Sequence, residues 1–197
     1  IDGAYNVTIE NATVNGDVVA NAGEGSEVTV GEGAKVNGTV KDALTIDLQD
    51  GASVNAIDES GAAVTMDGAS VSGDVTAKSL TANDNDEYNN SIGGDVEIEE
   101  ASIEATDGSF NIGGALIAAT DTAEFNFEGD NISIGSIDAD YFNPTLNFDD
   151  ATITLAITNM NGFNTILSLT NESDVTINGS ARLGSIEVEE DSTIRFA

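Results

Sequence analysis

The sequence predicts an all-β chain wound as a parallel β-solenoid, and three observations lead to that fold class. Apolar and polar residues alternate in short segments along almost the whole chain, and Gly, Asn and Asp separate these segments. No stretch of ten residues has helical periodicity. One short phrase also recurs, as "ENATVNGDV" at 10–18, "EGAKVNGTV" at 32–40, "DGASVNAI" at 50–57 and "DGASVSGDV" at 67–75.

Composition limits both the core and the partners. The 197 residues contain 36 acidic and five basic side chains, for a net charge of −31, and no His, Cys or Trp. The core must therefore be built mainly from Val, Ile, Leu and Ala, without disulfides. So acidic a surface repels phosphate backbones and anionic lipid, which disfavours binding of nucleic acid or of a membrane surface. No run is long enough to span a bilayer, and the opening residue Ile1 indicates a processed or excised piece.

The individual strands follow from alternation with a period of two, which places apolar side chains on one face of a strand. In chain order, the segments that read as strands are 5–14, 26–40, 95–105, 125–137, 150–158, 174–179 and 184–196. Asn-Gly pairs at 15–16, 37–38, 161–162 and 178–179 supply positive-φ turn positions between strands. The only proline, Pro144, lies in the loop-like stretch "DADYFNPT".

The spacing of the recurring phrase favours a solenoid over the alternative of β-sandwich modules. Val14, Val36, Val54 and Val71 are separated by 22, 18 and 17 residues. Such intervals suit one coil of two or three short strands, and equivalent positions then stack roughly 4.8 Å apart. A sandwich built from hairpins gives no reason for similar turns at a fixed period. We expect one solenoid domain over 1–197, with a more regular part at 1–82 and a wider, Phe-containing part at 92–197.

Several stretches resemble known families in style. "NATVNGDVV", "TLNFDDATITLAI" and "SDVTINGSARLGSIEVEEDSTIRF" resemble the passenger domains of bacterial autotransporter adhesins. This resemblance implies a right-handed parallel β-helix that is exported to the cell surface. "GASVSGDVTAKSL", at 68–80, is similar to the coils of bactofilins, which are cytoskeletal β-helices that polymerise end to end. In its strong acidity the chain also resembles S-layer proteins and type I-secreted proteins. The stretch "IGGDVEIEE", at 92–100, begins like the calcium-binding nonapeptide of type I-secreted proteins and then departs from it.

Catalysis is not expected. The absence of His and Cys excludes the Ser-His-Asp and Cys-His nucleophilic systems. A pair of carboxylates could in principle hydrolyse a glycoside. The acidic doublets, such as Asp149–Asp150 and Glu189–Glu190, are nevertheless unsuitable, because neighbours in a strand point to opposite faces. We therefore predict a protein that is not an enzyme.

Calcium is the one cofactor for which the sequence offers candidates. "NDNDEYNN", at 83–90, gathers Asp84, Asp86 and Glu87 in one expected loop, and oxygen ligands in a flexible loop suit Ca²⁺. Asp138 and Asp140 form a second candidate, two residues apart on one side of the chain. Neither stretch has the glycine and glutamate positions of an EF-hand. An ordinary solvated loop remains the alternative for both.

The function that we expect is structural or adhesive, at the cell surface or outside the cell of a bacterium. The partner would be a host or neighbouring cell surface, or other copies of the chain. In the second case the protein would be a subunit of an extracellular filament or S-layer-like array, joined end to end by strand pairing. The residues expected to mediate such self-association are Tyr5, Val7, Ile9, Ile194 and Phe196.

Overall fold

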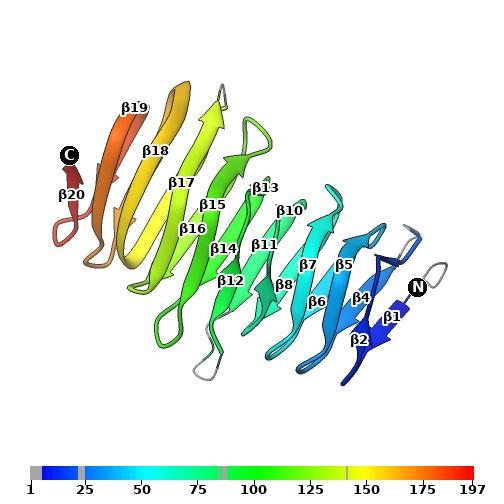
Figure 1. The fold of residues 1–197 in the computed structure, drawn as a ribbon. Coiled ribbons are helices and arrows are strands. Elements are labelled where there is room, and N and C mark those ends of the chain that lie inside the picture. Colours follow the sequence, from blue (N-terminus) through cyan, green and yellow to red (C-terminus); the bar gives the residue numbers. More distant parts are fainter. Residues whose placement is uncertain (1–5, 22–24, 84, 86–87, 141) are drawn as a thin grey trace.

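Figure 1 shows the fold as a computed structural model, which describes residues 6–21, 25–83, 85, 88–140 and 142–197. The described residues form strands, turns and bends and contain no helix. The strands stack side by side along one axis, with β1 (Asn6–Ile9, blue) and β20 (Thr193–Phe196, red) at opposite ends. The pairings between them are parallel. This architecture is a β-solenoid of about eight turns, which confirms the predicted fold and excludes the sandwich.

Each regular coil contributes strands to three strips that run along the axis. The first strip contains β1 (Asn6–Ile9), β4 (Glu27–Val30), β6 (Thr45–Leu48), β8 (Ala63–Asp67), β11 (Ser79–Asn83), β14 (Glu100–Glu104) and β16 (Glu124–Gly129). The second contains β2 (Thr13–Val14), β9 (Ser70–Val71) and β12 (Asn90–Ile92), and the third contains β3 (Val18–Val19), β10 (Val75–Thr76) and β13 (Val96–Ile98).

Longer strands continue around the corner from the second strip into the third. These are β5 (Lys35–Lys41), β7 (Ser53–Asp58), β15 (Phe110–Ala118) and β17 (Ile132–Asp140). The last coils consist of β18 (Thr145–Thr170), β19 (Asp174–Val188) and β20 (Thr193–Phe196). The beginning of β18 pairs with β16 in the first strip, and its final residues pair with residues 185–188 of β19.

The core is a set of apolar ladders inside the coils. The register pairs Val14 with Val36, Val36 with Val54, and Val54 with Val71, as the sequence spacing predicted. Two further ladders line the first strip, because period-two alternation turns every second side chain inward. They are Val7, Val28, Ile46, Val64, Leu80, Ala101, Phe125 and Leu146, and Ile9, Val30, Leu48, Met66, Ala82, Ile103, Phe127 and Phe148. All of these side chains are buried.

The large aromatic side chains enter the core only in the later coils. Phe110, Phe125, Phe127 and Phe148 are fully buried. The rings of Phe127 and Phe148 stack on each other with centroids 5.2 Å apart. Such offset stacking adds about 0.5–1.5 kcal/mol to the gain from burial. Phe142 is half-buried and packs against the core.

The recurring phrase is explained by the two corners that flank the second strip. At the first corner, Gly33, Gly51 and Gly68 have φ of 64°, 67° and 63°, and the alanine after each glycine is buried. At the second corner, successive coils approach so closely that a side chain has no space. A Cβ at Gly94 would lie 2.7 Å from the carbonyl carbon of Gly73. The phrase therefore encodes both bends of one coil.

Candidate binding surfaces

The outer face of the first strip carries a shallow trough that runs along the solenoid axis. It consists of three adjoining hollows of about 320, 330 and 180 Å³, which share Ser102 and Asn126 at one junction and Ser168 and Thr170 at the other. We call this surface the outer trough. It crosses β11, β14, β16, the beginning and end of β18, and residues 185–189. Its floor is formed by the outward side chains Thr81, Ser102, Asn126, Asn147 and Ser168.

Carboxylates line both sides of this floor, and Glu187 continues the floor row after Ser168. The acidic lining residues are Glu100, Glu104, Glu124, Glu128, Asp149, Glu187 and Glu189. Register pairing places Glu128 between Glu104 on one neighbouring strand and Asp149 on the other. Partial desolvation raises the pKa of Glu128 above its ordinary value, and the negative charges of Glu104, Asp149 and Asp150 raise it further. The trough is therefore a region of crowded negative charge.

Hydrogen bonds between coils fix the floor of the trough. The Asn147 Nδ2 donates to Asn126 Oδ1 at 2.7 Å and to Glu124 Oε1 at 3.1 Å. The Asn126 amide donates in turn to the carbonyl oxygen of Ala101 at 3.3 Å. At the rim, the hydroxyl of Thr170 donates to Asp149 Oδ1 at 2.9 Å. This surface is not evident from the sequence, because its members lie about one coil apart in the chain.

The C-terminal end of the solenoid presents apolar ladder positions to solvent. Leu167 and Leu169 are fully buried, but their register partners Ile186 and Val188 in the last coil are 41% and 42% exposed. Phe196, which pairs with the buried Ile177, is 57% exposed. In the described part of the chain, no strand lies beyond residues 185–188 and β20. We call this surface the terminal coil face.

The residues predicted to mediate self-association divide between the two ends. Ile194 is half-buried and Phe196 is exposed, and both lie in β20 at the terminal coil face. Val7 and Ile9 lie in β1 at the opposite end, but their side chains are only 6% and 3% exposed. Tyr5 lies outside the described residues. The two ends thus differ in how far their apolar residues are exposed, which the sequence analysis did not anticipate.

In the expected calcium loop at 83–90, the described residues Asn85 and Asn90 contact preceding coils. Asp84, Asp86 and Glu87 are outside the described residues, so the calcium prediction there stays a prediction. The Asn85 Nδ2 donates to Asp50 Oδ1 at 2.6 Å and to Asp67 Oδ1 at 2.8 Å. Asn90 is buried: its side-chain oxygen accepts from the N–H of Ala69 and its Nδ2 donates to the carbonyl of Asn83. These amides attach the loop to the solenoid.

The second calcium candidate lies in a strand. Asp138 and Asp140 belong to β17, so the loop expected here begins later in the chain. Asp138 is half-buried, and the side chain of Asp140 is outside the described part. Within the described ranges, no group of three or more Asp or Glu side chains is arranged to hold a metal ion. Calcium binding at this position stays a prediction.

Ion pairs occur away from the outer trough. Lys41 Nζ lies 2.8 Å from Asp17 Oδ2, and Arg195 pairs with Asp174. The hydrogen bond from Lys41 lowers the pKa of Asp17, and the reciprocal contact raises the pKa of Lys41.

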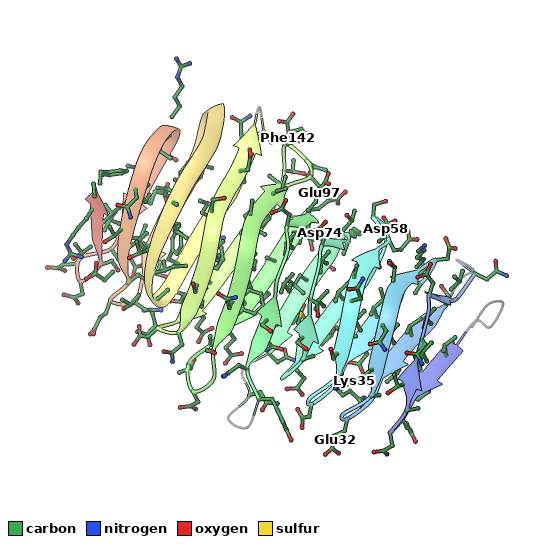
Figure 2. The ribbon with its side chains drawn as sticks, in the orientation of Figure 1. Glu32, Lys35, Asp58, Asp74, Glu97 and Phe142 are labelled. Carbon is green, nitrogen blue, oxygen red and sulfur yellow. The ribbon has the colours of Figure 1, made fainter. Side chains whose placement is uncertain are left out.

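Figure 2 shows Asp58, Asp74 and Glu97 following one another along one edge of the solenoid.

Comparison with known proteins does not assign this chain to a family. No family model, curated protein or solved structure matches it. Over the residues that the structure describes, no helix is long and apolar enough to cross a membrane.

Proposed function

We propose that this protein is a non-enzymatic structural or adhesive β-solenoid, exported by a bacterium to its cell surface or to the extracellular space. The observation that supports this function is the continuous stack of parallel coils. Each coil covers the inward apolar side chains of the next coil. The stack therefore forms an extended scaffold rather than a closed pocket. A long, strongly anionic scaffold suits display at a surface, because its charge keeps it soluble and separated from anionic lipid.

The location can be tested in the source bacterium with antibodies against the folded chain. Intact cells should be labelled as strongly as permeabilised cells, and protease added outside should remove the label. A cytoplasmic marker protein, which must stay unlabelled in intact cells, controls for leakage. Labelling that requires permeabilisation would contradict the proposed export.

A second candidate function is end-to-end assembly, and the terminal coil face is the observation that favours it. The outer edge of the last coil carries strand backbone together with exposed Ile186, Val188 and Phe196. An incoming strand that pairs with this edge would bury these side chains and extend the ladders. The first coil of another copy supplies strands in the corresponding strips, with Val7 and Ile9 in the ladders that end at Ile186 and Val188. Because a head-to-tail contact does not close, it would produce a filament.

The expected association depends on salt. Two chains of net charge −31 repel each other, and screening at about 150 mM salt reduces this repulsion. Sedimentation velocity and negative-stain imaging should therefore show longer particles as NaCl is raised. Val188→Lys should prevent their formation, because it places a charge in the contact. Ile166→Lys is the matched control, since Ile166 is similarly exposed but lies on the outer face of β18. A strictly monomeric wild-type chain at every salt concentration would remove the filament candidate.

A further inference from the structure

We infer that the outer trough binds an extended segment of a partner protein that is rich in Lys and Arg. This inference goes beyond the proposed surface function and does not depend on where the protein resides. Three properties of the trough lead to it: its length, its charge and the chemistry of its floor.

The length of the trough suits a chain-like ligand. The surface crosses six neighbouring strands, from β11 to residues 185–188. With about 4.8 Å between neighbouring strands, it extends for roughly 24 Å. An extended peptide advances about 3.4 Å per residue, so roughly seven residues would occupy it. A single metal ion would fill only a small part of this length.

The charge of the trough selects a cationic ligand. Among the acidic lining residues, Glu100, Glu104 and Glu128 are exposed and extend outward from adjacent strands. None of the lining residues is Lys or Arg, and the ion pairs of Lys41 and Arg195 lie elsewhere. Partial desolvation raises the pKa of Glu128, and the negative charges of Glu104, Asp149 and Asp150 raise it further; a positive group between these carboxylates offsets the second of these causes.

The floor of the trough favours a peptide over other cationic polymers. Side-chain amides and hydroxyls recur on successive strands, and inter-coil bonds hold Asn126 and Asn147 in fixed orientations. The hydroxyls of Thr81, Ser102 and Ser168 can both donate to and accept from a peptide backbone, and the side-chain oxygen of Asn147 can accept from it. A polysaccharide site usually offers exposed aromatic rings as well. Phe127 is the aromatic residue that lines the trough, and its ring is buried in the core.

The test uses fluorescence anisotropy with a labelled, end-capped octapeptide of alternating Lys and Gly, and a Ser-Gly octapeptide as the neutral probe. The trough variant is Glu100→Gln, Glu104→Gln and Glu128→Gln combined. The matched control is Glu10→Gln, Asp58→Asn and Glu97→Gln combined, which removes the same charge from exposed positions elsewhere. At about 150 mM NaCl, the trough variant should bind the Lys-Gly peptide about tenfold more weakly, and the control less than about threefold.

Additional variants and probes distinguish a peptide site in the trough from an effect of net charge and from a sugar site. Equal weakening in both triple variants would show that only net charge matters, and would overturn the inference. Asn126→Ala together with Asn147→Ala keeps the charge and should still weaken binding. A glucosamine oligomer that binds more tightly than the peptide, with the same dependence on the variants, would overturn the assignment to a peptide. Amide chemical-shift mapping on the wild-type chain needs no variant: shifts should include Ser102, Asn126, Asn147 and Ser168, and shifts confined to residues outside the outer trough would contradict the location.

Discussion

Gly94→Ala provides the sharpest test of how the coils are packed at the second corner. A Cβ at this position would lie 2.7 Å from the carbonyl carbon of Gly73 and 2.8 Å from the backbone nitrogen of Asp74. Ordinary van der Waals contact begins near 3.4 Å, so the methyl group is about 0.7 Å too close to the backbone. The carboxylate of Asp74 lies closer still and could turn aside, but the backbone of the neighbouring coil cannot rotate away.

The loss of stability can be estimated from two destabilising contributions and one stabilising contribution. Forcing one extra methyl group into a packed site costs about 1–3 kcal/mol. The shift would also strain the bonds from Gly94 N–H to the Gly73 carbonyl and from Gly114 N–H to the Gly94 carbonyl, both 3.1 Å long. Each such bond contributes about 0.5–1.5 kcal/mol. The reduced freedom of the unfolded chain returns about 0.4–1 kcal/mol. We expect a net loss of about 3 kcal/mol in the free energy of unfolding.

Urea denaturation followed by far-UV circular dichroism measures this loss directly. Gly61→Ala is the matched control, because its Cβ would meet only the flexible carboxylate of Glu59, at 3.3 Å. It should leave stability unchanged or raise it by up to about 1 kcal/mol. A loss below about 1 kcal/mol for Gly94→Ala, or equal effects of the two substitutions, would refute the close approach of coils at this corner.

The remaining predictions concern the core and pH. Phe127→Ala should lower the free energy of unfolding by about 3–5 kcal/mol in the same assay, whereas a loss under about 1 kcal/mol would contradict its burial against Phe148. Because the pKa of Glu128 is raised on folding, its ionisation destabilises the folded state as pH rises above the ordinary value of 4.5. Glu128→Gln should therefore be more stable than wild type at neutral pH, and this advantage should vanish at about pH 4. An advantage that is constant with pH would contradict a raised pKa of Glu128 in the folded chain.

The sequence predicted the fold well because a solenoid repeats one local rule. Alternation with period two decides which side chains point inward, and the intervals between Val14, Val36, Val54 and Val71 decide which of them stack. Both features follow from the strand geometry of a short segment. The recurring glycines likewise indicated turns, although only the structure showed that those at the second corner are required by close approach of the coils.

The binding surfaces were far less predictable. The outer trough joins residues about one coil apart, such as Asn126 and Asn147, and the coils vary in length, so outward partners cannot be counted along the chain. The contacts of Asn85 with Asp50 and Asp67 show the same difficulty, because they connect a loop to two earlier coils. The β-solenoid, its coils of two or three short strands and its stacked inward valines could be predicted from the sequence, since these depend on local periodicity. The neighbours of each outward side chain, and the exposure of Ile186, Val188 and Phe196, became visible only in the folded chain, because both depend on how whole coils stack.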